Sequence, residues 1–142
     1  MPSFKLSLSI GQYKGSSMSL RISANGKTIF DVDRTDKTKL DIEFECDLPT
    51  EIIFDVGNKG LMDTLVDSNG KIIQDKFVQV DNIIVDRLPV KKWILESRLF
   101  EFIPTTGATL QTNCFSYNGR AVLSLPEKTS FDFMLRLLTV RG

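Results

Sequence analysis

Apolar and polar residues alternate with a period of two through much of this sequence, and that pattern restricts the fold more than any other feature. Successive side chains of a β-strand point to opposite faces, so alternation places one set in a core and the other in water. The segments with this pattern, or with a short apolar run of strand length, are Phe4–Ile10, Met18–Ser23, Leu40–Asp47, Glu51–Val56, Phe77–Val85, Trp93–Phe102, Leu110–Tyr117 and Ala121–Leu125.

The dipeptide Asn-Gly occurs three times, at Asn25-Gly26, Asn69-Gly70 and Asn118-Gly119. Each pair is followed by a basic residue and then by a strand pattern. Asn and Gly tolerate a positive φ, so the pair suits a type I′ turn, whose twist matches that of the strands it joins. The sequence therefore predicts three β-hairpins.

The segment 131–138 fits two patterns. Phe131, Met134, Leu135 and Leu138 have helical spacing, whereas Phe131, Phe133, Leu135 and Leu137 have strand spacing. We favour a strand, because the rest of the chain is all-β and a final strand could cover an open sheet edge. Gly57–Leu65 is interpreted as a loop, with room for one short helical turn.

A length of 142 residues is typical of one domain, and no low-complexity linker divides the chain. We therefore expect residues 1–142 to form a single domain. About ten short strands around one core predict an all-β fold, namely an antiparallel two-sheet β-sandwich of jelly-roll-like or Ig-like form. A closed barrel is the alternative.

Charge and composition argue against several functions. The 18 basic residues balance 18 acidic ones, so the basic excess of a nucleic-acid-binding protein is missing. There is no histidine, which removes the usual general base and the usual zinc ligand. We therefore predict a protein that is not an enzyme, although two carboxylates meeting in space could still serve glycoside hydrolysis.

Compartment signals are few. The N-terminal residues alternate and lack the apolar run of a secretion signal, and no run approaches the ~20 apolar residues that cross a bilayer. The two cysteines, Cys46 and Cys114, lie in strand patterns and are expected to be free thiols. These features predict a protein that does not contact membranes and that stays in the cytoplasm, or in the virion if it is viral.

Three carboxylates fall close together at Asp31, Asp33 and Asp36. Oxygen ligands on a loop are what Ca²⁺ prefers, so these residues form a candidate calcium site. Arg34 and Lys37 lie among them and would partly neutralise such a site. The alternative is a solvated turn, and no other cofactor is expected.

Four further acids, Asp41, Glu43, Glu45 and Asp47, share one face of a predicted strand. A neighbouring strand that carries Lys or Arg would explain them structurally. A docking face for a basic protein partner is the functional interpretation, and Leu137–Arg141 is a second candidate contact surface.

Three aromatic residues, Trp93, Tyr117 and Tyr13, are candidate ligand-binding residues. An exposed flat ring beside hydrogen-bonding side chains is how β-sandwich lectins hold sugars. A single Trp is more often part of a core, whereas Tyr117, beside the Asn118-Gly119 turn, is expected to be exposed.

The stretch from Asp67 to Leu95 contains Asp67–Ile73, Val78–Asp86 and Trp93–Leu95 as a strand-turn-strand pattern. It resembles small β-sandwich accessory proteins of tailed bacteriophages that have a carbohydrate-binding-module-like fold. The resemblance implies a structural role in a virion, such as capsid decoration or a tail component, and it transfers no site residues.

Two functions are therefore expected, a leading one and an alternative. The first is a structural or assembly module that contacts other protein subunits within a larger assembly. The alternative is a carbohydrate-binding sandwich that uses its exposed aromatics, with calcium as a possible aid.

Overall fold

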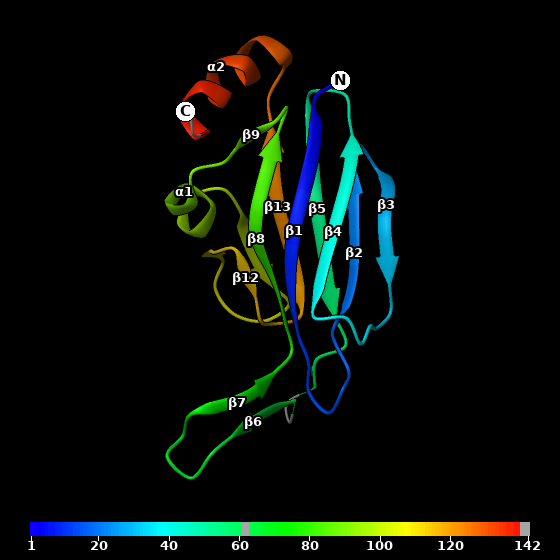
Figure 1. The fold of residues 1–142 in the computed structure, drawn as a ribbon, viewed down its shortest axis with the longest axis vertical. Coiled ribbons are helices and arrows are strands. Elements are labelled where there is room, and N and C mark those ends of the chain that lie inside the picture. The colour runs from blue at the N-terminus through cyan, green and yellow to red at the C-terminus, as the bar shows by residue number, and fades with distance from the viewer. Residues whose placement is uncertain (61–62, 140–142) are drawn as a thin grey trace.

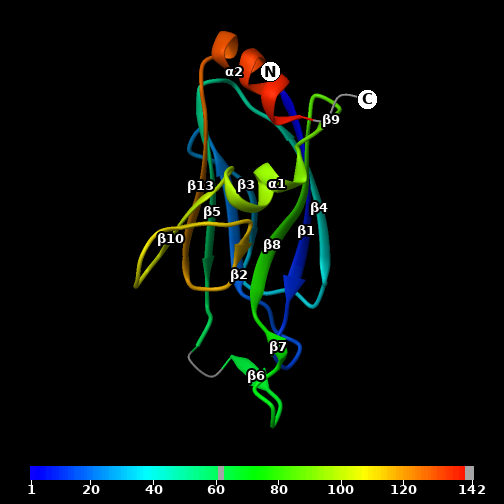
Figure 2. The ribbon, with the colours of Figure 1, turned by 90° about the vertical axis from the view of Figure 1, so that its left-hand side faces the viewer.

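Two antiparallel sheets pack face to face in the computed structural model, which describes residues 1–60 and 63–139 (Figure 1, Figure 2). The first sheet has the order β12-β8-β1-β4, with β9 also paired to β8. Its strands are β1 (Ser3–Gly11), β4 (Lys39–Glu45), β8 (Phe77–Val85), β9 (Leu88–Pro89) and β12 (Cys114–Phe115).

The second sheet has the order β11-β10-β13-β5-β2-β3. Its strands are β2 (Ser19–Ala24), β3 (Lys27–Val32), β5 (Thr50–Gly57), β10 (Glu101–Pro104), β11 (Leu110–Gln111) and β13 (Gly119–Leu125). A separate ribbon of β6 (Thr64–Val66) and β7 (Ile72–Asp75) projects from one end of the sandwich (Figure 1). The predicted antiparallel two-sheet sandwich is confirmed.

Alternation along the strands produces the core as predicted. In β1, Phe4, Leu6, Leu8 and Ile10 are buried between the sheets, while Lys5 and the serines face outward or lie half-buried. Four phenylalanines, Phe54, Phe100, Phe102 and Phe115, form an aromatic cluster with ring centroids 5.4–5.7 Å apart. Three of these rings belong to strands of the two sheets, namely β5, β10 and β12.

Two of the three Asn-Gly pairs do form hairpins. Asn25 and Gly26 have φ values of 53° and 73° and join β2 to β3, as a type I′ turn requires. The β6–β7 turn differs from the prediction: it runs from Asp67 to Gly70, and Gly70 N–H donates to Asp67 C=O over 3.0 Å. Gly70, and not Asn69, has the positive φ, which is the glycine-bulge form of a longer hairpin loop.

The third pair was predicted wrongly. Asn118-Gly119 connects β12 to β13, and these strands belong to different sheets. The glycine is needed here for close approach, because a Cβ on Gly119 would meet the Ile103 carbonyl oxygen and lie 2.7 Å from Pro104 Cα. The sequence also missed a hairpin at Asp86-Arg87, where both residues have positive φ between β8 and β9.

This close approach gives a prediction. The Gly119→Ala substitution should lower the free energy of unfolding by about 2 kcal/mol, because the new methyl group meets backbone atoms that cannot rotate away. Gly60→Ala is the matched control, since its Cβ would lie 3.5 Å from Asp63 Oδ2, an ordinary contact. Urea denaturation of both variants measures the difference, and equal midpoints would refute the steric explanation.

Helices replace two predicted strands. Residues 128–138 form α2 (Lys128–Leu138), so the predicted final strand is wrong. Phe131 and Leu135 are buried and Met134 and Leu138 are half-buried, and together they close one end of the space between the sheets. The Phe131 ring lies 6.5 Å from that of Phe4. Helical spacing prevailed because it directs these four side chains to the same face, whereas a strand would split them.

The segment Trp93–Phe102 was predicted as one or two strands. It forms α1 (Lys92–Ser97), which buries Ile94 and Leu95, and only its last part enters β10. Leu110–Tyr117 likewise divides between β11 and β12, on different sheets. Of the predicted 57–65 loop, Thr64 and Leu65 belong to β6, and residues 61–62 lie outside the described part.

Both cysteines are free, as predicted. Burial is the main cause that raises the pKa of the Cys46 thiol and of the Cys114 thiol, so neither is activated as a thiolate. In the described ranges, neither helix has the length and apolar content that a bilayer crossing requires.

Candidate binding site beside Tyr117

A hollow of about 260 Å³ opens at the end of the sandwich that carries the ribbon. Three connections form its walls. Lys59 and Gly60 follow β5 and Thr64 begins β6, Thr105 and Thr106 follow β10, and Tyr117 and Asn118 lie between β12 and β13. The Tyr117 side chain is 58% exposed, so its ring is available to a ligand.

Asn118 ties these three connections together. Lys59 N–H donates to Asn118 Oδ1 and Asn118 Nδ2 donates back to Lys59 C=O, each over 2.9 Å. The Asn118 carbonyl accepts a hydrogen bond from Thr105 N–H, also over 2.9 Å. The walls of the hollow are therefore fixed to one another before any ligand arrives, which lowers the entropy that binding must overcome.

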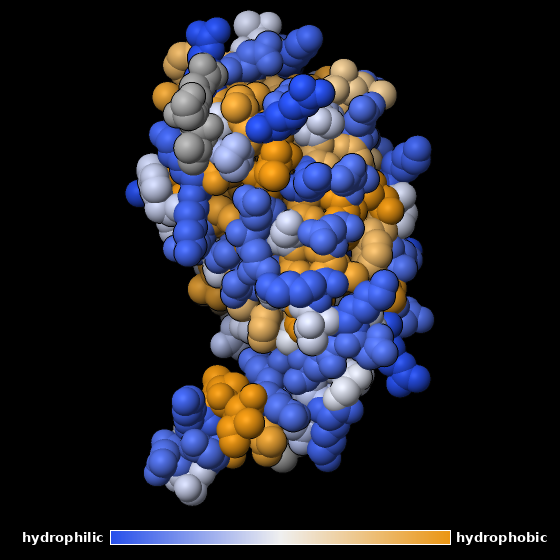
Figure 3. All heavy atoms as spheres, viewed as in Figure 1, coloured by the Kyte–Doolittle hydropathy of each residue, from blue (hydrophilic) through white to orange (hydrophobic). Residues whose placement is uncertain are grey.

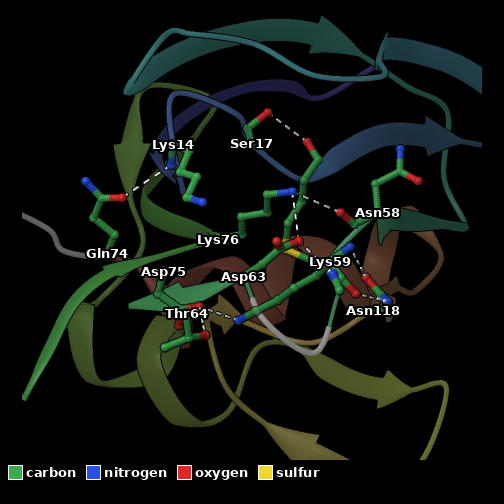
Figure 4. Close-up of polar contacts among 12 residues, drawn as sticks. Lys14, Ser17, Asn58, Lys59, Asp63, Thr64, Gln74, Asp75, Lys76 and Asn118 are labelled. Carbon is green, nitrogen blue, oxygen red and sulfur yellow. Dashed lines mark hydrogen bonds and ion pairs between the residues drawn. The ribbon is translucent and has the colours of Figure 1, made fainter. Parts of the chain in front are cut away.

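An ion pair lies behind the ring. Lys59 Nζ is 2.5 Å from Asp75 Oδ1 and donates to the Ser116 carbonyl over 2.7 Å (Figure 4). Thr64 Oγ1 donates to the same Asp75 oxygen over 2.7 Å. The ammonium group also lies 6.0 Å from the centroid of the Tyr117 ring, within reach of a cation–π interaction that helps to place the ring.

A second ion pair lies beside the first. Lys76 Nζ is 2.9 Å from Asp63 Oδ2 and donates to the Asn58 carbonyl over 3.2 Å (Figure 4). Asp63 Oδ2 also accepts from Gly60 N–H over 2.7 Å. This backbone hydrogen bond, followed by the one from Lys76, lowers the pKa of Asp63, so the carboxylate stays charged at neutral pH.

The chemistry of the hollow is neutral and amphipathic. The exposed walls present an aromatic face, threonine hydroxyls and an amide, while the Lys59 charge is compensated by Asp75. A flat ring bordered by neutral hydrogen-bonding groups suits a ligand with both C–H faces and hydroxyl groups.

The other two predicted aromatics lie outside this hollow. Trp93 is the second residue of α1 and is 59% exposed, so the expectation that it belongs to the core is wrong. Tyr13 is half-buried in a tight turn, where Lys14 Nζ lies 5.3 Å from its ring centroid. Neither lines the walls around Tyr117.

The structure does not gather Asp31, Asp33 and Asp36 into a metal-binding cluster. Asp31 Oδ2 is 3.4 Å from Arg21 Nη2, and Asp36 lies exposed in the loop that follows β3. Across residues 1–60 and 63–139, no three Asp, Glu, Cys or His side chains are arranged to hold a metal ion.

The acidic strand face has partners on β1. Lys5 Nζ is 3.2 Å from Glu43 Oε1, and Ser7 Oγ donates to Asp41 over 3.0 Å. Glu45 lines a shallow hollow of about 520 Å³ together with Lys5 and Arg87, and Asp47 is exposed beyond the strand end. The neighbouring strand thus supplies the basic residue that the structural interpretation required.

The second candidate contact surface, Leu137–Arg141, is only partly exposed in its described residues. Leu137 is exposed, but Leu138 is half-buried and Thr139 is buried. Val140 and Arg141 lie outside the described residues.

Sequence reasoning missed the two lysine–aspartate pairs because their members come from separate segments. One signal was present: Lys76 has the same parity as Val78 and Val80, which are buried in β8. A lysine at an inward position must find a partner, and this position therefore pointed to an ion pair.

No protein-family model matches the chain, and the comparison with curated proteins finds no significant match. Two solved structures share the fold. One is the selenomethionine form of vCBM60, described in work on a circular permutation that links two families of calcium-dependent carbohydrate binding modules. It has a TM-score of 0.51 and 16% identity, over 87% of this chain and 91% of that one.

The other is vCBM60 in complex with galactobiose, with a TM-score of 0.53 and 16% identity over 86% of this chain and 97% of that one. At this identity the likeness concerns the fold. The chain therefore has a β-sandwich of the kind found in carbohydrate-binding modules.

Proposed function

We propose that residues 1–142 form a single non-enzymatic domain that binds carbohydrate, with a sugar ring resting on Tyr117. One observation carries the proposal: the exposed Tyr117 ring borders a preformed hollow with neutral hydroxyl and amide groups. The shared fold with a galactobiose complex supports it.

Each wall has a part in binding. The apolar C–H face of a sugar stacks on Tyr117, which Lys59 and Asn118 hold in place. The hydroxyl groups of Thr105 and Thr106 both donate and accept hydrogen bonds, as sugar hydroxyls require. Because Asp75 compensates Lys59, the site favours neutral over acidic sugars.

Calorimetric titration with neutral oligosaccharides, beginning with galactobiose, tests this proposal. We expect Tyr117→Ala to weaken binding about tenfold, since loss of a stacked ring costs about 1.4 kcal/mol. Tyr117→Phe should retain most of the affinity. Trp93→Ala is the control, because it removes an exposed ring outside the hollow. Equal affinity of Tyr117→Ala and the unaltered protein would reject Tyr117 as the platform.

An assembly module acting through protein contacts is the second candidate. The observation that favours it is the ribbon of β6 and β7, which exposes Leu65, Val66, Ile72 and Ile73 (Figure 3). Exposed aliphatic side chains on a narrow two-stranded ribbon are typical of an interaction surface. The narrower form of this candidate is the virion accessory role implied by the resemblance.

Light scattering coupled to size-exclusion chromatography tests the second candidate. A protein that assembles should lose higher-mass species when Ile72 and Ile73 are replaced by serine. A protein that is strictly monomeric in this measurement, and that is not found in purified virions, would count against this second candidate.

A further inference from the structure

Two lysines with little solvent exposure neutralise the carboxylates beneath the candidate site. The side chains of Lys59 and Lys76 are only 12% and 10% exposed. A buried ammonium group is costly unless it is paired and hydrogen-bonded. Each of these lysines meets that condition, because its ammonium group contacts one carboxylate and one main-chain carbonyl. Both lysines are therefore structural parts of this end of the sandwich.

The oxygens that surround these lysines are of the type that Ca²⁺ selects. Lys59 Nζ contacts Asp75 Oδ1 and the Ser116 carbonyl oxygen. Lys76 Nζ contacts Asp63 Oδ2 and the Asn58 carbonyl oxygen. Carboxylate and carbonyl oxygens are the usual calcium ligands. A calcium ion here would have to expel an ammonium group and leave it without its partner (Figure 4).

Two carboxylates on the outer face of the second sheet are paired with arginines. Arg21 lies 3.4 Å from Asp31, and Arg120 Nε lies 2.7 Å from Asp55 Oδ1. These acids and Asp33 line one shallow hollow of about 650 Å³ between the two arginines. These four carboxylates, two paired with lysine and two with arginine, are therefore engaged by cationic side chains, and no three Asp, Glu, Cys or His side chains of residues 1–60 and 63–139 are grouped to hold a calcium ion.

We infer that this chain, unlike the calcium-dependent modules that share its fold, stabilises its binding end with lysine ammonium groups and requires no calcium. The part that concerns sugar rests on the proposed function, whereas the part that concerns folding does not. Lys59 and Lys76 are positioning residues here, since they act by holding the loops and the Tyr117 ring.

The test compares the protein in excess Ca²⁺ with the protein in excess EDTA. Thermal unfolding should give the same Tm in both conditions, and calorimetric titration of Ca²⁺ alone should release no binding heat. The affinity for galactobiose should also be unchanged. A variant in which Asp31, Asp33 and Asp36 are all replaced by asparagine should match the unaltered protein in each measurement.

A Tm that rises with Ca²⁺ would overturn the inference. Loss of that rise in the triple asparagine variant would place the metal at Asp31, Asp33 and Asp36 instead. Failure of sugar binding in both Ca²⁺ and EDTA would reject the proposed function, and an unchanged Tm would still support metal-independent folding. Sugar binding seen only with Ca²⁺ would reject the inference and leave the proposed function standing.

Discussion

Replacing Phe115 with alanine is expected to lower the free energy of unfolding by about 4 kcal/mol. The Phe115 side chain is fully buried, and its ring centroid lies 5.4–5.7 Å from those of Phe54, Phe100 and Phe102. Removing it opens a cavity that three other rings border, and packed rings of two sheets cannot collapse to fill it.

Guanidinium denaturation measures this effect. Phe133→Ala is the matched control, because that ring is 65% exposed on α2 and its loss should change stability by less than about 0.5 kcal/mol. Phe115 is the last residue of the short strand β12, and Tyr117 follows two residues later. If the domain binds carbohydrate as proposed, the Phe115→Ala variant should also bind galactobiose less well where it remains folded. Similar losses for Phe115→Ala and Phe133→Ala would contradict the predicted core.

The second large effect concerns the ion pair behind Tyr117. Lys59→Met should cost about 3 kcal/mol of stability, because it leaves the Asp75 carboxylate largely buried without its cation. The Ser116 carbonyl loses a donor at the same time. Chemical denaturation at neutral pH gives the magnitude, and the galactobiose affinity of the folded variant reports whether the Tyr117 ring has moved.

Lys92→Met is the control for Lys59→Met. Lys92 pairs with Glu96 at 3.9 Å, but its side chain is 87% exposed, so the loss of the pair should be near zero. A double variant with Lys59→Met and Asp75→Leu should recover part of the stability, since both charges are then absent. If Lys59→Met is as stable as Lys92→Met, the ion pair does not hold this end of the sandwich.

These two predictions connect the core to the site. The aromatic cluster holds β12 through the Phe115 ring. Hydrogen bonds of Lys59 and Asn118 hold the connection between β12 and β13. Tyr117 is therefore exposed on a segment whose backbone is well restrained. A rigid platform of this kind loses little entropy when a ligand binds. Tyr117 is preferred over Trp93 and Tyr13 because it combines this restraint with a place in the wall of the hollow.

The sequence predicted the strands well where one face is buried and the other is solvated. Burial alternates along β1, β2, β4, β5 and β13. In β8 it alternates on either side of an irregularity at Asp81 and Asn82. Sequence reasoning failed where tertiary packing selects between two local patterns. The segment 131–138 became a helix because four apolar side chains on one helical face fill the open end between the sheets.

The exposure of the candidate aromatic residues was likewise predicted in one case and missed in the other. The exposure of Tyr117 followed from its place beside an Asn-Gly pair, although that pair serves a close approach rather than a hairpin. The exposure of Trp93 did not follow, because whether an indole is buried depends on which face of α1 meets the sheets.

Local side-chain alternation and turn residues by themselves determined that this chain forms an antiparallel sandwich, because a strand's two faces are encoded in adjacent residues. Only the tertiary structure decided that Lys59 meets Asp75, that Lys76 meets Asp63, and that three connections enclose Tyr117. Those contacts join segments that are distant along the chain, and sequence spacing carries no record of which distant segments the packing of two sheets brings together.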